Sequence, residues 1–365
     1  MPFYPPKIPH DYSFMKQSLT RQSNIELLRI IAMLMVITLH VCNAFGSWLV
    51  PRVTAHPFHW LGIIFTNTAC IGCVDIFVLI TGWFGTRFKP KGALKLVFQV
   101  VFIASCMFLL LWALGYPLPD NWHYYVQAYW SYWFACSYLI LYLLTPALNA
   151  FVEQSDERTL RRFLITFYAF VAPLSYFFTD LGRGFSAIAF VGLYLLGRYL
   201  RLYLSPRLGE GFSKCKLASI WLGITVIIAG TLWTCTLTSQ TATTYMVNVL
   251  FAYTDPLVII GSSALLLCFA RMRLQSRTVN WLAMGSFAAY LMHQQLYVRP
   301  HFFKWFTDLD AHFSTFSYMA LAAASIMGVY LLACLLDVVR RWAWRGIEET
   351  YNSRTKSTQD YTRNE

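Results

Sequence analysis

Apolar stretches as long as a membrane-spanning helix recur along the chain. An α-helix needs roughly 20 mostly apolar residues to cross the hydrocarbon core of a bilayer. Stretches of about this length lie at 24–45, 58–84, 94–115, 130–152, 163–179, 185–204, 217–237, 246–270, 278–297 and 316–339. The pattern predicts an all-α fold, a polytopic membrane bundle of about ten transmembrane helices. The stretch 163–179 is short and contains Pro173, so it matches the pattern least well.

The composition agrees with a membrane protein. Only 13% of the 365 residues are charged, against about 25% in a typical soluble domain, while 57% are hydrophobic. A single globular core would not bury this much apolar surface, so lipid must cover part of it. The net charge of +12 does not indicate a nucleic-acid partner, because the basic residues lie in short blocks between the apolar stretches.

The distribution of Lys and Arg predicts the orientation in the membrane. Twenty-four of the 29 basic residues lie before residue 24, after residue 339 or in alternate loops; the opposite loops contain four, and Arg29 lies inside the first helix. By the positive-inside rule, both termini should be cytoplasmic. We expect a cytoplasmic tail at 1–22, a membrane domain at 23–340 and a second tail at 341–365. The polar start lacks a signal-peptide pattern, so the first helix should remain as an anchor.

The first helix contains three ionisable residues in an apolar setting. Arg29 and His40 are eleven residues apart, which is about three helical turns, so they share one face at a separation of roughly 16 Å. Glu26 lies one turn before Arg29 and can pair with it. One interpretation is an interfacial ion pair with an outward-reaching histidine. The other is a polar stripe that lines a passage, in which His40 acts as a general base.

Five stretches in order resemble one family. They are the Arg29-to-His40 spacing with its preceding Glu26, Gly72-Cys-Val-Asp-Ile-Phe-Val-Leu-Ile-Thr-Gly82, Tyr132-Trp-Phe to Leu-Leu-Thr-Pro146, Tyr194-Leu-Leu-Gly-Arg198, and Ser286-Phe-Ala-Ala-Tyr-Leu-Met-His293. Together they resemble the acyltransferase 3 family, bacterial membrane O-acyltransferases that modify cell-surface glycans. The layout is similar to stand-alone members such as those that acetylate enterobacterial common antigen. Ile30, Thr81 and Ala288-Ala289 are mild departures from the family pattern.

The resemblance implies a reaction and its partners. The donor would be acyl-CoA, usually acetyl-CoA, used as a substrate on the cytoplasmic side, with no bound cofactor. The acceptor would be a hydroxyl of an extracytoplasmic glycan or lipid-linked saccharide. The protein would be a multi-pass protein of the bacterial cell (inner) membrane. The extra hydrolase-like domain of some members has no place in 365 residues, so we expect any such second step to be absent or to be carried out by a partner.

Further residues are candidates for the site. A carboxylate at Asp75 inside the second helix needs a partner, for which we expect Arg29 or His40; it either orders the helices or handles protons. The resemblance implies that basic residues after Gly82, namely Arg87, Lys89 and Lys95, hold the coenzyme phosphates. As an alternative, they only fix the topology.

His293 and Tyr290 lie one turn apart on the ninth predicted helix, and both should face inward. Either they bind the acceptor, or His293 is a structural histidine bonded to a neighbouring helix. Asp255-Pro256 should break the eighth helix near its middle. No His/Asp/Glu set has metal-ligand spacing, so no metal is expected, and the CxxC pair Cys70 and Cys73 is interpreted as packing.

The sequence thus predicts a membrane O-acyltransferase, most simply an O-acetyltransferase, with His40 as base or nucleophile. The alternative is a polytopic transporter or flippase for an envelope glycan or lipid precursor, which would also place charges and broken helices in a bundle. A transporter usually has two related halves, and no internal repeat is visible here. A non-catalytic scaffold would tolerate the loss of Arg29 and His40.

Overall fold

The computed structural model describes residues 21–45, 50–117, 121–177, 179–209 and 211–363. Throughout this part of the chain, all regular structure is helical. The elements in chain order are α1 (Ser23–Ala44), α2 (Val50–Ala55), α3 (Pro57–Cys70), α4 (Cys73–Phe84), α5 (Pro90–Ala113), α6 (Trp122–Trp130), α7 (Trp133–Gln154), α8 (Glu157–Phe177), η1 (Thr179–Gly184), α9 (Ala187–Tyr199), η2 (Leu200–Leu204), α10 (Ser205–Arg207), α11 (Lys214–Thr238), α12 (Gln240–Leu250), α13 (Pro256–Ala270), α14 (Arg277–Ala283), α15 (Ser286–His293), α16 (Arg299–His312) and α17 (Thr315–Arg363).

Seven helices among the described residues are long and apolar enough to cross a membrane. They span Ser23–Ala44, Pro57–Phe84, Pro90–Ala113, Trp133–Gln154, Ala187–Arg207, Lys214–Thr238 and Thr315–Tyr351. Each coincides with one of the ten predicted stretches, so the all-α polytopic membrane fold is confirmed. The larger number of crossings stays a prediction.

The other three predicted helices differ in a way that the local sequence explains. The stretch 163–179 falls within α8, which contains Pro173 and starts with the polar turn Glu157-Arg-Thr. The stretch 246–270 is divided between α12 and α13. Asp255 caps α13 by accepting hydrogen bonds from the backbone N–H groups of Leu257 and Val258, so the predicted break is present. The stretch 278–297 is also divided, at Met284-Gly285, into α14 and α15.

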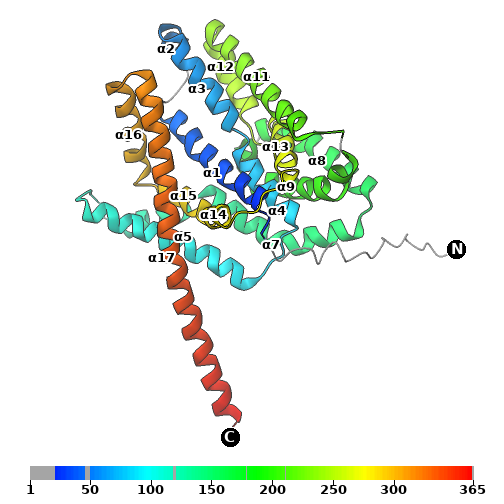
Figure 1. The fold of residues 1–365 in the computed structure, drawn as a ribbon, viewed down its shortest axis with the longest axis vertical. Helices are drawn as coiled ribbons and strands as arrows, with labels where there is room; N and C mark the ends of the chain where they lie inside the picture. The colour runs from blue at the N-terminus through cyan, green and yellow to red at the C-terminus, as the bar shows by residue number, and fades with distance from the viewer. Residues whose placement is uncertain (1–20, 46–49, 118–120, 178, 210, 364–365) are drawn as a thin grey trace, which may run out of the picture.

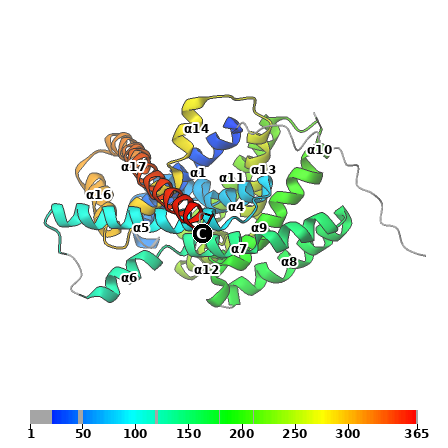
Figure 2. The same ribbon diagram turned by 90° about the horizontal axis from the view of Figure 1, so that it is seen from below.

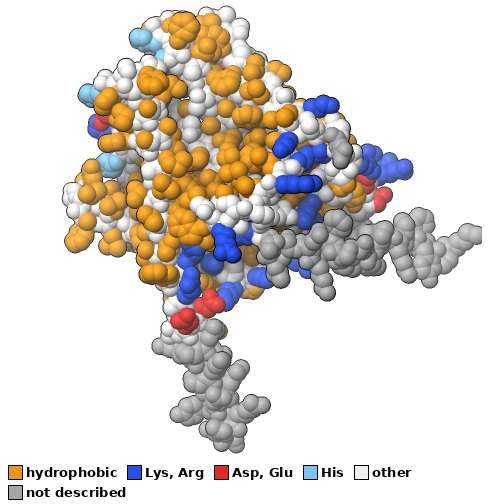
Figure 3. All heavy atoms as spheres, in the orientation of Figure 1, with side chains coloured by type: hydrophobic (Ala, Val, Ile, Leu, Met, Phe, Trp, Pro, Cys, Tyr) orange, Lys and Arg blue, Asp and Glu red, His pale blue; other side chains and the backbone are white. Residues whose placement is uncertain are grey.

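The two ends of the bundle differ in charge. In Figure 3, Lys and Arg side chains gather at the lower right and bottom of the molecule, while the visible His side chains lie at the upper left. The C-terminal part of α17 leaves the bundle on the side of the basic residues (Figure 1). By the positive-inside rule this basic end is the expected cytoplasmic end, and the orientation of the chain in the membrane stays a prediction. We use "inner end" and "outer end" in this sense below.

Two glycines allow a close helix crossing between α4 and α9. A Cβ atom on Gly82 would lie 2.1 Å from the carbonyl oxygen of Tyr194, and one on Gly197 would lie 2.4 Å from that of Leu79. No larger residue fits without moving one of the helices. Both glycines belong to the motifs that carry the family resemblance, and their structural role is this contact.

Helix α1 lies in the centre of the bundle. In Figure 2, which looks along α17 from its C-terminal end, α1 and α4 lie between α14, α13 and α5. Helix α1 packs against elements from both halves of the chain: α3, α4, α13, α14, α15, α16 and α17. Its buried face includes Ile25, Leu28 and Ala32. Because other helices surround α1, its polar stripe, which includes Arg29 and His40, faces the interior of the protein and not the lipid.

Candidate active site

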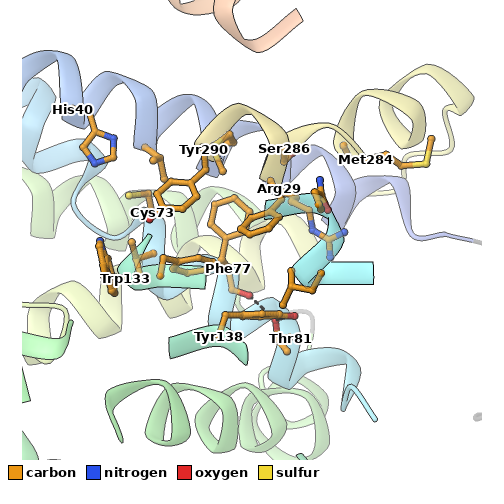
Figure 4. A pocket seen from close by; sticks show the side chains of 18 of the residues that line it. Arg29, His40, Cys73, Phe77, Thr81, Trp133, Tyr138, Met284, Ser286 and Tyr290 are labelled. Carbon is orange, nitrogen blue, oxygen red and sulfur yellow. Dashed lines mark hydrogen bonds between the residues drawn. The ribbon is translucent and has the colours of Figure 1, made fainter. Parts of the chain in front are cut away.

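A cavity of about 460 Å³ lies beside the polar stripe of α1. Arg29 and His40 both line it, and Figure 4 shows them at opposite ends, with Phe77 and Tyr290 between them. Its middle is lined mainly by apolar side chains such as Met33 and Val36. The passage predicted along α1 is therefore present, with a histidine at its outer end and an arginine towards its inner end.

His40 is hydrogen-bonded to a second histidine. Its Nδ1 atom lies 2.9 Å from Nε2 of His293, and the two ring centroids are 5.1 Å apart. His293 is only 1% exposed, and its own Nδ1 lies 2.5 Å from the carbonyl oxygen of Ala289, one turn earlier on α15. The hydroxyl of Tyr132 donates a hydrogen bond to the carbonyl oxygen of Leu291 and so connects the start of α7 to α15 close to His293.

The direction of these hydrogen bonds follows from the acceptor at their end. A carbonyl oxygen can only accept, so Nδ1 of His293 carries a proton. In the neutral ring Nε2 of His293 is then an acceptor, and Nδ1 of His40 donates to it. This fixes the tautomer of neutral His40 and leaves its Nε2 with a free lone pair. Because His40 lines the cavity, this lone pair is available for proton transfer or nucleophilic attack.

Aromatic side chains form one wall of the cavity, and Figure 4 shows one of them, Trp133, at the same end as His40. Trp133 begins α7, Phe185 precedes α9 and Tyr253 lies in the break between α12 and α13; all three line the cavity. The rings of Trp133 and Tyr253 are stacked with centroids 6.0 Å apart, and Phe185 lies within 4.7 Å of both. On the α1 side, Asn43 follows His40 by one turn, and its Oδ1 accepts a hydrogen bond from Asn67. The outer end thus combines a base, an amide and flat apolar faces.

The predicted pair of Glu26 and Arg29 is confirmed. Nη1 of Arg29 donates to Oε2 of Glu26 at 3.0 Å, and Arg21 approaches the same carboxylate at 3.9 Å. Glu26 is 6% exposed and does not line the cavity, whereas both arginines do. The carboxylate therefore anchors the arginines from behind and leaves the cavity wall basic.

The predicted partner of Asp75 is wrong. Asp75 is 0% exposed on α4, and both carboxylate oxygens lack a hydrogen-bond partner among the described residues. It forms no ion pair with Arg29 or His40, and it does not line the cavity. Its carboxylate lies in the first turn of α4, where the helix dipole favours negative charge. A direct part for Asp75 in proton handling stays a prediction without a contact to support it.

Of the three basic residues predicted to bind the coenzyme, one lines the cavity and two lie outside it. The Arg87 side chain is 75% exposed and lies 3.7 Å from Glu153, outside the cavity. Lys89 is also exposed and outside it; its backbone N–H donates to the hydroxyl of Tyr142. Only Lys95, at the inner end, lines the cavity. The expected loop after Gly82 therefore does not form its mouth.

His293 and Tyr290 also have different surroundings. Tyr290 lines the cavity, as expected for a residue that contacts a substrate. His293 lies behind His40, and both its ring nitrogens are already hydrogen-bonded. The interpretation of His293 as a histidine bonded to a neighbouring helix is the one that the geometry favours. Acceptor binding by either residue stays a prediction.

Two residues at the inner end were not singled out by sequence reasoning. Arg340 and Arg341 of α17 line the cavity and form ion pairs with Asp337, at 2.8 and 3.1 Å. In the sequence they contribute only to the excess of basic residues that predicts the orientation. One sequence signal could have identified them. Asp337 lies at the end of an apolar stretch, three residues before Arg340 and four before Arg341, which is the spacing of ion pairs within a helix. Within the described residues, no group of three or more His, Cys, Asp and Glu side chains could hold a metal ion.

The fold and the cavity define a polytopic membrane protein with a histidine-centred internal site. A family model described as an acyltransferase domain matches residues 22–338, which is most of the chain and includes every residue discussed above except Arg21, Arg340 and Arg341. The chain therefore belongs to the acyltransferase 3 family and is a membrane acyltransferase. No curated protein and no solved structure matches it, so the resemblance to stand-alone glycan acetyltransferases stays a prediction.

Proposed function

We propose that this protein transfers an acyl group, most simply acetyl, from cytoplasmic acyl-CoA to a hydroxyl of a glycan or lipid-linked saccharide on the outer side of a bacterial inner membrane. The observation that carries the proposal is the position of His40 Nε2 at the outer end of the cavity, where it has no hydrogen-bond partner among the described residues. Membership of the family supports acyl transfer in general. The acetyl group, the coenzyme donor and the glycan acceptor are our assignments.

The chemical step needs one base and one proton carrier. Nε2 of His40 accepts the proton of the acceptor hydroxyl as its oxygen attacks the thioester carbonyl carbon. The C–S bond then breaks, and the imidazolium returns the proton to the thiolate of coenzyme A. Nδ1 of His40 donates to His293 throughout, so His293 holds the ring in place and shares its positive charge. A transient acyl group on Nε2 of His40 is the alternative route, with the same atoms in place.

The shape of the cavity supports a long, thin donor. Arg29 and His40 lie on one face of α1, about 16 Å apart by helical rise, and the wall between them is mostly apolar. A long, extended arm, such as pantetheine, fits such a passage better than a bulky or folded group. The phosphates would stay at the inner, basic end while the thioester reaches His40.

The outer end of the cavity supports a saccharide acceptor. Trp133, Phe185 and Tyr253 form an aromatic cluster that lines the same cavity as His40. Such faces suit the apolar side of a sugar ring, while the Asn43 amide suits a neighbouring hydroxyl. A hydroxyl bound between them would lie beside the free nitrogen of the base.

The test compares cells that carry the wild-type gene, a deletion or His40→Ala at matched membrane abundance. O-acetyl groups on the surface glycans are measured by NMR. We expect the deletion to remove a set of acetyl signals and His40→Ala to fail to restore them. Restoration of the full signals by His40→Ala would contradict the assignment of the base.

A transporter or flippase is the second candidate, favoured by one observation. Helices α12 and α13 are broken at Asp255 inside the bundle, as in many transporters. Such a protein would move a saccharide or lipid across vesicle membranes without acyl-CoA. Transport that persists in His40→Ala and needs no acyl donor would favour this candidate over acyl transfer.

A further inference from the structure

We propose that Arg340 and Arg341 of α17, together with Arg21, Arg29 and Lys95, bind the phosphate groups of the donor's nucleotide. This site rests on the proposed function, because it assumes a coenzyme A thioester as donor. It replaces the exposed loop of Arg87 and Lys89, which the structure places outside the cavity. We call these five residues the inner basic cluster.

The cluster forms where the starts of α1 and α5 lie beside the middle of α17. Arg21 precedes α1 and Arg29 lies near its start, Lys95 comes from the first turns of α5, and Arg340 and Arg341 come from the middle of α17. Helices α1, α5 and α17 pack against one another in the pairs α1–α17 and α5–α17. All five side chains line the same cavity that His40 lines at its other end. The cluster is therefore continuous with the candidate active site.

The carboxylates of the described residues do not balance the charge of the cluster. No Asp or Glu lines the cavity among the described residues. Two carboxylates form ion pairs with members of the cluster: Glu26 with Arg29, and Asp337 with Arg340 and Arg341. A third, Glu348, interacts with Lys95 but is paired with Lys91, which lies outside the cluster. Five positive charges against two negative ones leave three uncompensated. Clustered cations repel one another and lose hydration when they line a cavity in a membrane protein, so an anion bound between them would stabilise the arrangement.

The burial of Arg340 is not explained by a role in setting the orientation of the protein in the membrane. A cation that only sets orientation needs contact with water, yet the Arg340 side chain is 4% exposed. Its Nε and Nη2 donate to Oδ1 of Asp337, and its Nη1 is buried without a hydrogen-bond partner among the described residues. Asp337 is 0% exposed and also accepts a hydrogen bond from Gln99. The carboxylate therefore holds the guanidinium in one orientation at the cavity wall.

The chemistry of the cluster fits several phosphates better than one. Guanidinium groups bind phosphate oxygens in pairs of parallel hydrogen bonds, and ammonium groups act as point charges. Three uncompensated charges, spread over three helices, match a ligand with more than one phosphate group. Since the apolar part of the cavity runs from here to His40, the same ligand should carry a slender arm. A coenzyme A thioester has both features.

The test measures binding of coenzyme A to purified full-length protein in phosphatidylcholine nanodiscs by calorimetry, so no turnover is needed. Lys95→Ala and Arg341→Ala remove members that are partly exposed. Because Arg340→Ala would leave the buried Asp337 carboxylate without this partner, the combined variant Asp337→Asn/Arg340→Gln removes both charges of the pair at once. Arg87→Ala is the matched control: a basic residue on the same side, paired with Glu153 but outside the cavity.

We expect each cluster variant to weaken coenzyme A binding about tenfold or more, because a charge-assisted hydrogen bond is lost, while Arg87→Ala binds as the wild type does. Adenosine 3′,5′-bisphosphate should compete with coenzyme A, and pantetheine should not. An equal loss in Arg87→Ala, or wild-type binding in the cluster variants, would overturn the site and leave the proposed function standing.

Two further outcomes identify other failures. If wild-type protein binds no coenzyme A, the donor assignment itself fails. If phosphatidylglycerol in the nanodisc displaces coenzyme A while adenosine 3′,5′-bisphosphate does not, the cluster holds a lipid headgroup and the proposal is overturned.

Discussion

His293 holds His40 through a hydrogen bond of 2.9 Å between Nε2 and Nδ1, with its own Nδ1–H bound to the carbonyl oxygen of Ala289. A chain of two hydrogen bonds thus runs from the backbone of α15 to the ring on α1. It sets which nitrogen of neutral His40 is free. In hydrolases with a catalytic triad, a buried aspartate orients the histidine in the same manner. Here a neutral imidazole does so, at lower electrostatic cost inside a membrane protein.

The crossing of α4 and α9 should not tolerate a methyl group. Gly82→Ala would place Cβ 2.1 Å from the carbonyl oxygen of Tyr194. We expect a loss of about 1–3 kcal/mol of stability or more from overpacking, seen as a lower melting temperature of the detergent-solubilised protein. Gly223→Ala is the control, because nothing lies within 4 Å of its Cβ position on α11. It should be neutral or slightly stabilising, and equal losses in both variants would contradict the packing argument.

The buried ion pair on α17 should matter more than an exposed one. Asp337→Ala leaves Arg340 and Arg341 without their carboxylate and should cost about 3–5 kcal/mol. Asp308→Ala breaks the exposed pair with Lys304, also within a single helix, and should change stability by less than about 1 kcal/mol. The two melting temperatures give the comparison. A similar small effect of both variants would mean that Asp337 does not neutralise the arginines.

The aromatic wall should act on the acceptor and not on the donor. Trp133→Ala removes the stacked face beside Tyr253, so we expect glycan O-acetylation to fall about tenfold while coenzyme A binding is unchanged. Trp112→Ala is the control, since that side chain is 69% exposed on α5. A loss of coenzyme A binding in Trp133→Ala would instead place the donor against the wall.

Asp75 should not need its charge for an ion pair. Asp75→Asn keeps the shape, and no cation of the described residues lies within ion-pair distance. We expect membrane abundance and melting temperature to stay close to those of the wild type, with a change of stability below about 1 kcal/mol. Unfolding of Asp75→Asn at matched expression would show that a charged partner exists.

Features within one helix could be predicted from the sequence. The pairing of Glu26 with Arg29 and the shared face of Arg29 and His40 follow from helical spacing alone. The break at Asp255-Pro256 follows from capping and from the missing N–H of proline. These predictions needed no knowledge of how the helices pack.

Contacts between helices could not be predicted in the same way. Asp75 lies on α4, where nearly every residue is buried, so hydropathy gives no indication of which neighbour its side chain faces, and the predicted partner was wrong. His40 and His293 are 253 residues apart. Arg340 reaches the cavity only because α17 packs against α1 and α5. In each case the contact depends on how the helices pack, which cannot be predicted from the periodicity of a single helix.

The most direct test of the account asks whether His40 and His293 act as one unit. Vesicles containing wild-type protein, His40→Ala, His293→Ala or the double variant, at matched abundance and melting temperature, are given labelled acetyl-CoA. The rate of O-acetyl transfer to the membrane glycan is then measured. We predict a loss of at least about 100-fold for His40→Ala and a smaller one for His293→Ala, with the KM for acetyl-CoA unchanged. The double variant should be no slower than His40→Ala alone. Full activity of His293→Ala, or losses that simply multiply in the double variant, would contradict the pair as the catalytic centre.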